Sequence, residues 1–114
     1  MLLRSGIFTS EQLQAIARDY RHASLEPAEV AMMAFAEKIA ADANRVSADD
    51  IDALRRHGFS DTEILDIALA AAARCFFSKV LDGVGAAPDD AFMSLDENLR
   101  RTLAVGRPFT GRTA

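Results

Sequence analysis

The sequence predicts an all-α protein: a compact bundle of about five helices with one long, buried central helix. Two observations indicate this fold class. Ala, the best helix former, occurs 22 times, whereas the β-branched residues Val, Ile and Thr together occur 16 times. Helix start signals, apolar residues at helical spacing and helix end signals also follow one another along the chain, and no stretch alternates as a strand does.

The first two helices are predicted from their N-terminal signals. Thr9 or Ser10 can cap a helix that runs to about Arg21. Its apolar face repeats at steps of three and four residues: Leu13, Ile16, Ala17 and Tyr20. Pro27 is tolerated in the first turn of a second helix, which we expect to end near Asn44.

The third and fourth helices are predicted on either side of Gly58. Ser47 starts a short helix that ends at this glycine, as a C-cap glycine would end it. Ser60 and Glu63 form a capping box that opens a helix of roughly 21 residues, which continues to Gly83. This helix is apolar almost all round, so we expect neighbours to bury it on several sides.

The last helix is expected from Pro88 to about Val105, and residues 106–114 are expected to form a flexible tail. A chain of 114 residues has room for one domain. The sequence therefore predicts a single helical domain over residues 1–105.

Composition argues against several classes of function. A net charge of −4 gives no general attraction to nucleic acid. One cysteine excludes an internal disulfide framework and a cysteine-rich zinc site, and with only two histidines we expect neither a metal nor a cofactor. The most apolar stretch, residues 64–81, is too short and too charged to span a membrane. The start of the chain lacks the apolar core of a signal peptide, so a cytoplasmic location is expected.

Cys75 is the one candidate nucleophile that the sequence offers. Arg74 precedes it and Lys79 follows one turn later, and neighbouring cations favour a reactive thiol. Phe76, Phe77 and the preceding alanines instead favour a buried cysteine with a structural role, which is the interpretation we prefer. The position three residues on is Ser78, so no C-x-x-C pair is present. His57, at a helix end, and His22 are expected to have structural roles.

Residues 25–85, from "LEPAEVAMMAFAEKIAADANRV" through "GFSDTEILDIAL" to "DGVG", resemble the C-terminal half of the peroxidase-related proteins. These proteins belong to the alkylhydroperoxidase D and carboxymuconolactone decarboxylase superfamily. The preceding run "IARDYRHASL" is similar to the segment that leads into that half, so the resemblance covers roughly residues 12–105. It implies an alkylhydroperoxidase D-like fold and an antioxidant function.

The resemblance also implies which residues occupy the family's site positions. Catalytic members use a Glu, a C-x-x-C pair and a His to reduce hydroperoxides, and this motif normally lies upstream of the matching region. We therefore expect that the catalytic half is absent from this chain. A second helical unit of the family echoes the motif and places Glu63 at the Glu position, Cys75 and Ser78 at the two Cys positions, and Asp82 at the His position.

Three functions follow from these observations. The resemblance implies a peroxidase-related protein, which we expect to lack dithiol activity because the second thiol and the imidazole are missing. The first alternative is a non-enzymatic helical module that forms a homo-oligomer through its apolar helix faces. The second is a monothiol peroxidase in which an external thiol reductant resolves oxidised Cys75.

Overall fold

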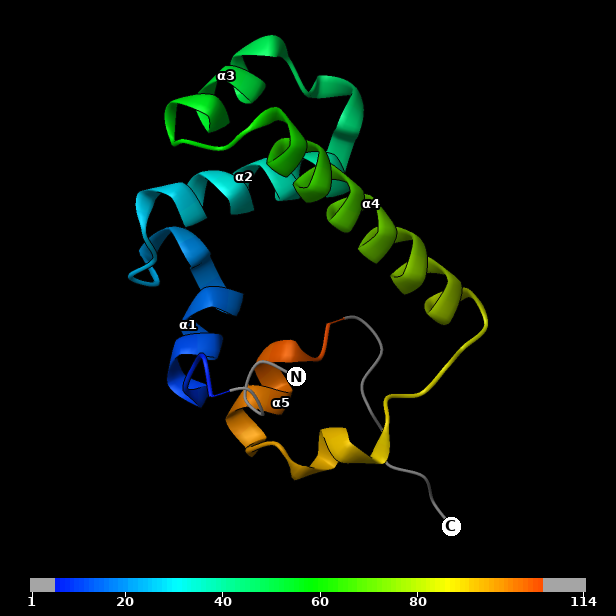
Figure 1. Cartoon of the computed structure of the whole chain (residues 1–114). Helices are drawn as coiled ribbons and strands as arrows, with labels where there is room; N and C mark the ends of the chain where they lie inside the picture. The colour runs from blue at the N-terminus through cyan, green and yellow to red at the C-terminus, as the bar shows by residue number, and fades with distance from the viewer. Residues whose placement is uncertain (1–5, 106–114) are drawn as a thin grey trace. The chain divides into compact units, whose positions relative to one another are not determined.

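The computed structural model describes residues 6–105, and within this range every regular element is a helix. The all-α fold class with five α-helices is therefore confirmed. The α-helices (Figure 1) have these bounds: α1 Ser10–Asp19, α2 Pro27–Asp42, α3 Ala48–Arg56, α4 Asp61–Gly83 and α5 Glu97–Leu103. Three short 3₁₀ turns lie between them in the described residues. The tail predicted over residues 106–114 lies outside the described residues.

The chain divides into two compact units. Among the described residues, the first unit comprises residues 6–24 and 87–105, and the second comprises residues 25–86. The single domain expected over residues 1–105 stays a prediction.

The second unit contains α2, α3 and α4 around a small apolar core. Phe35 of α2, Leu54 of α3 and Ile64 of α4 are buried together at its centre. Half-buried residues from all three helices and from the connecting turns surround this centre: Ala31, Ile39, Val46, Ile51, Phe59, Ile67 and Ala68. One apolar residue from each helix thus fixes how the three helices pack.

The turn between α3 and α4 follows from its sequence. Gly58 has a φ of +91°, a left-handed conformation that favours glycine. The Gly58 and Phe59 amides donate to the carbonyl oxygens of Arg55 and Leu54, which is the Schellman pattern at the end of a helix. Phe59 packs on the core containing Ile64, five residues on, as a hydrophobic staple does. These contacts set where α4 begins.

In the first unit, α1 packs against α5, and the buried side chains are Tyr20 and Leu99. Thr9 caps α1, as predicted. The helix predicted from Pro88 is shorter than expected: residues 90–94 form a 3₁₀ turn, Leu95 is extended, and α5 begins after Asp96. The Asp96 carboxylate accepts a hydrogen bond from the Leu99 amide at 3.0 Å, so this cap, and not the proline, starts the helix.

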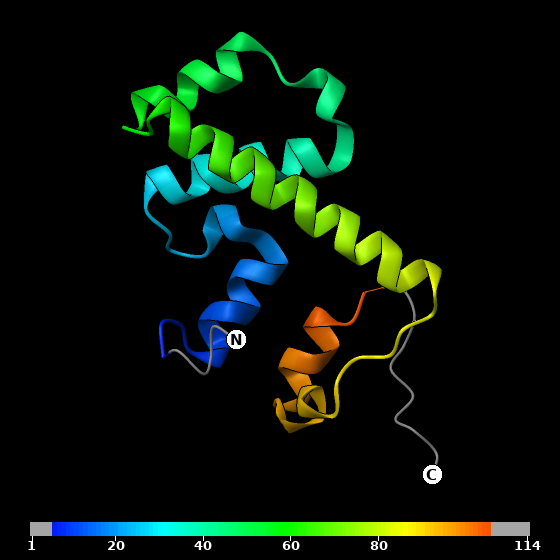
Figure 2. The same cartoon turned by 45° about the vertical axis from the view of Figure 1, so that its right-hand side comes forward.

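The long central helix is present, but within residues 25–86 its neighbours do not bury it on several sides as predicted. Ile64 is its one buried residue. At 23 residues α4 is about 34 Å long, whereas α2 with 16 residues is about 24 Å long and α3 is shorter still. Figure 2 shows α4 crossing α2 and continuing beyond it. Within this unit, two shorter helices cannot surround α4, so they pack on one face of it alone.

Among the described residues, no helix combines the length and the apolar character that crossing a membrane requires.

Candidate functional site

All four residues predicted at the family's site positions lie on α4. Because α4 is continuous from Asp61 to Gly83, helix geometry fixes their relative positions. Cys75, Ser78 and Asp82 follow one another at steps of three and four residues and therefore share one face. Glu63 precedes Cys75 by twelve residues, which is about 18 Å along the axis and a third of a turn around it. The structure therefore brings three of the four residues onto one face and leaves Glu63 apart.

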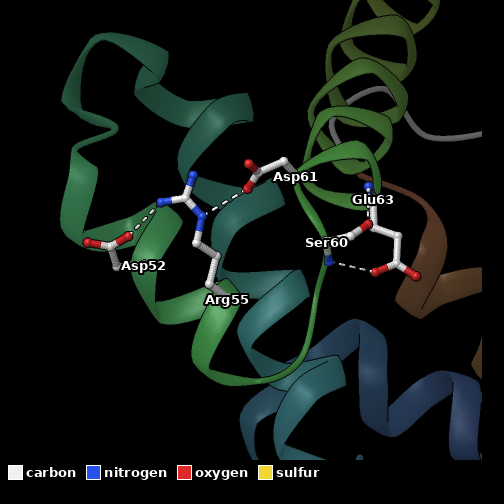
Figure 3. Close-up of polar contacts among 5 residues, drawn as sticks. All are labelled: Asp52, Arg55, Ser60, Asp61 and Glu63. Carbon is white, nitrogen blue, oxygen red and sulfur yellow. Dashed lines mark hydrogen bonds and ion pairs between the residues drawn. The ribbon is translucent and has the colours of Figure 1, made fainter.

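Glu63 takes part in the capping box that opens α4. Its carboxylate accepts a hydrogen bond from the Ser60 amide at 2.7 Å, and its own amide donates to the Ser60 hydroxyl oxygen at 3.1 Å (Figure 3). These two bonds satisfy backbone donors that the first turn of a helix leaves without partners. In this chain Glu63 therefore has a structural contact that accounts for its position.

Cys75 is a free thiol whose side chain is half-buried. It lies on the face of α4 that also carries the core residues, which we call the inner face: Ile64, Ile67, Ala68, Ala71, Cys75 and Ser78. Phe76 and Phe77, which the sequence analysis took as evidence that Cys75 is buried, are themselves 67% and 60% exposed. The aromatic pair therefore does not enclose the thiol, and Cys75 owes its partial burial to the inner face.

The two histidines lie at helix ends, as expected. The His57 amide closes the end of α3 by donating to carbonyl oxygens of that helix, and the residue is exposed. His22 contacts the Asp19 carboxylate at 2.6 Å, and this hydrogen bond lowers the pKa of Asp19. Within residues 6–105, no group of three or more His, Cys, Asp and Glu side chains is arranged to hold a metal ion.

An ionic cluster that was not predicted from the sequence lies at the start of α4. The Arg55 guanidinium donates from Nε to Asp61 and from Nη1 to Asp52, both at 2.8 Å (Figure 3). The Asp61 contact, followed by the Asp52 contact, raises the pKa of Arg55 above its usual value. Asp52 and Arg55 are three residues apart on α3, a spacing that predicts their contact, but the contact with Asp61 depends on the turn at Gly58.

The same cluster borders an open apolar groove of about 290 Å³ between α2, α3 and α4. Its lining comprises Phe35, Ile51, Arg55, Asp61, Ile64, Leu65 and Ala68. The two charged residues already bind each other, so the groove offers apolar surface and no unpaired charge from this pair. It therefore suits an apolar side chain better than an ion.

Next to the groove, α4 presents a continuous apolar stripe to solvent. We call it the outer face: Leu65, Leu69, Ala72, Phe76 and Val80. The steps of four, three, four and four residues keep these side chains on one side of the helix. The four larger ones are between 48% and 67% exposed, and Phe77 and Leu81 are also exposed, on another side of α4. Most of the apolar surface of α4 thus lies outside the core.

Comparison of the chain with protein families, with curated proteins and with solved structures finds no match in any of the three. The alkylhydroperoxidase D resemblance therefore stays a prediction.

Proposed function

We propose that this chain is a self-associating helical module of the alkylhydroperoxidase D type that lacks dithiol peroxidase activity. The observation that carries the proposal is the outer face of α4, where the exposed fractions of Leu65, Leu69 and Phe76 are 57%, 58% and 67%. A helix that is apolar on both sides needs cover on both sides. A second copy of the chain supplies that cover without any other partner.

The amount of surface supports this proposal. The four larger side chains of the outer face, Leu65, Leu69, Phe76 and Val80, expose roughly 450 Å² of apolar surface, given the usual size of such side chains. Contiguous apolar patches on monomers are at most about 300–600 Å². A standard interface buries about 800 Å² on each partner. The outer face is thus as large as the largest apolar patches on monomers, which are often functional, and it supplies about half of one side of a standard interface.

The absence of a dithiol mechanism follows from the residues present. A dithiol peroxidase regenerates through an internal disulfide, and the chain has one cysteine. Ser78 cannot form that bond. Glu63 is engaged in the capping box, about 18 Å along α4 from Cys75. Within this chain, no pair of these residues can carry out the family's dithiol step.

Light scattering across a concentration series tests the self-association. We expect an assembly larger than the 12.3 kDa chain at tens of micromolar protein. Leu69→Lys places a charge in the outer face and should yield a monomer. Ala70→Lys adds the same side chain at the next exposed residue, outside that face, and should leave the assembly intact. A wild-type chain that remains monomeric contradicts the proposal.

A monothiol peroxidase is the second candidate, and the partial exposure of Cys75 favours it. In this reaction the thiol is oxidised to a sulfenic acid while a hydroperoxide is reduced to an alcohol. Two equivalents of an external thiol then restore the cysteine, and a disulfide and water are released. Peroxide consumption in the presence of a thiol reductant tests this candidate. Turnover that Cys75→Ala abolishes supports it, and equal rates for the two proteins contradict it.

A further inference from the structure

The groove and the outer face meet at Leu65, which belongs to both. Phe76, the most exposed large side chain of the outer face, lies eleven residues further along α4. Eleven residues are about three turns, so Phe76 projects in nearly the same direction as Leu65, about 16 Å away along the axis. One end of the outer face therefore carries an apolar groove, and the other end carries an aromatic ring.

We propose that two copies of the chain pair through antiparallel α4 helices, so that Phe76 of each copy enters the groove of the other. This inference rests on the proposed self-association and specifies its geometry. In a two-fold pair, any contact between two residues is made twice. Antiparallel pairing places the ring of each copy at the groove of the other, whereas parallel pairing would place like ends together.

The register that joins Phe76 to the groove also matches the residues between them. When Phe76 lies opposite Leu65 of the second copy, Leu69 lies opposite Ala72 of the second copy. This follows because residue numbers rise along one helix as they fall along its antiparallel partner. A large side chain thus faces a small one at both central positions. Helices approach closely where a large residue of one faces a small residue of the other, as in ridge-into-groove packing.

Charge supports the same register. Asp61 and Lys79 are 18 residues apart, which is five full turns, so both lie on the same flank of the outer face. Antiparallel two-fold pairing brings like flanks together, and in this register Lys79 lies beside Asp61 of the second copy. The Asp61 side chain is 76% exposed, so it can accept from Lys79 while it accepts from Arg55. The groove itself needs no ionic partner, because Arg55 already binds Asp52 and Asp61.

Disulfide trapping between two variants tests the register directly. Both variants carry Cys75→Ala, and one adds Asp61→Cys while the other adds Lys79→Cys. In the proposed pair, each new cysteine is more than 20 Å from its own copy in the partner and close to the other variant's cysteine. We expect the mixture to form a cross-linked dimer under mild oxidation, and neither variant alone to do so.

A second measurement tests how much the Phe76 ring contributes to dimerisation. Phe76→Ala should weaken dimerisation at least 30-fold, as the loss of a central interface residue does. Phe77→Ala is the matched control, since Phe77 is similarly exposed but lies outside the outer face. We expect this control to weaken dimerisation by less than about three-fold.

The outcomes separate this inference from the proposed function. Cross-linking of the mixture alone, together with a larger effect at Phe76 than at Phe77, supports the pairing. An assembly in which the mixture does not cross-link, or in which either variant cross-links alone, overturns the register and leaves self-association standing. A monomeric wild type overturns both.

Discussion

Helix α4 has two apolar faces with different surroundings. Ile64 and Leu65 are neighbours in sequence and similar in hydrophobicity, yet Ile64 is 5% exposed and Leu65 is 57% exposed. Ile64 points to Phe35 and Leu54 in the core, whereas Leu65 begins the outer face. The difference shows that an apolar residue on this helix is buried only where another helix of its unit lies against it.

The surroundings of the core also differ from those of the outer face in their polar contacts. Lys38 of α2 donates to Asp50 of α3 at 2.6 Å, and Arg55 of α3 donates to Asp61 of α4 at 2.8 Å. These contacts join the three helices that enclose the core. The outer face is bordered by Lys79 on one flank and by Ala73 and Asp66 on the other. An apolar centre with charged residues at its edge is typical of an interface.

Truncation at adjacent positions should separate the two faces most clearly. Ile64→Ala removes a buried side chain from the core and should lower the free energy of unfolding by about 2–5 kcal/mol. Leu65→Ala removes a mostly exposed side chain and should change the stability of the monomer much less. Urea denaturation at one fixed, low protein concentration measures both, because self-association makes apparent stability depend on concentration. Equal losses at the two positions would mean that the faces do not differ as described.

Replacement of an alanine by leucine should also affect the inner face more than an exposed position, with a smaller difference in the free energy of unfolding. Ala71 is half-buried on the inner face, so Ala71→Leu should overpack it and cost about 1–3 kcal/mol. Ala70 is exposed, and Ala70→Leu should leave the unfolding transition nearly unchanged. Thermal unfolding followed by circular dichroism gives both values. An unchanged melting temperature for Ala71→Leu would place that residue outside the packed face.

Local signals predicted the helices well because they depend on residues close in sequence. Thr9, Ser47 and Ser60 precede the starts of α1, α3 and α4, as expected. The last helix was misplaced because Pro88 permits a helix start without requiring one, whereas Asp96 provides a cap that bonds to the helix amides.

Burial of α4 was predicted less well, because it depends on how much helix surrounds it and not on its own composition. The sequence does not show whether an apolar side chain is covered by another helix of the same chain or by a second chain. The groove and the contact between Arg55 and Asp61 escaped prediction for a related reason, since both arise only when the turn at Gly58 brings α3 against α4. For Glu63, the capping box was predicted, and its meaning for the site became clear from the hydrogen bond to Ser60.

Acid should lower the free energy of unfolding by weakening the contact between Lys38 of α2 and Asp50 of α3. Of the three predictions made here for stability, this one has the smallest expected effect. The hydrogen bond from Lys38, followed by that from the Ser47 amide, lowers the pKa of Asp50 from 3.8 to about 2. A carboxyl group whose pKa is lower in the folded state stabilises the fold above its unfolded pKa. This stabilisation should be complete above about pH 5 and should be lost progressively as the pH falls towards 2.

The difference in urea midpoint between wild type and Asp50→Asn isolates this contribution, because the other acids titrate in both proteins. The difference should be constant from pH 7 to about pH 5 and should shrink at lower pH, because Asp50 gains its proton in the unfolded chain near pH 4 but in the folded protein only near pH 2. Asp49→Asn, at the neighbouring acid of the same first turn, controls for the helix dipole. A difference that does not change between pH 7 and pH 2.5 would show that the charge of Asp50 does not hold α2 and α3 together.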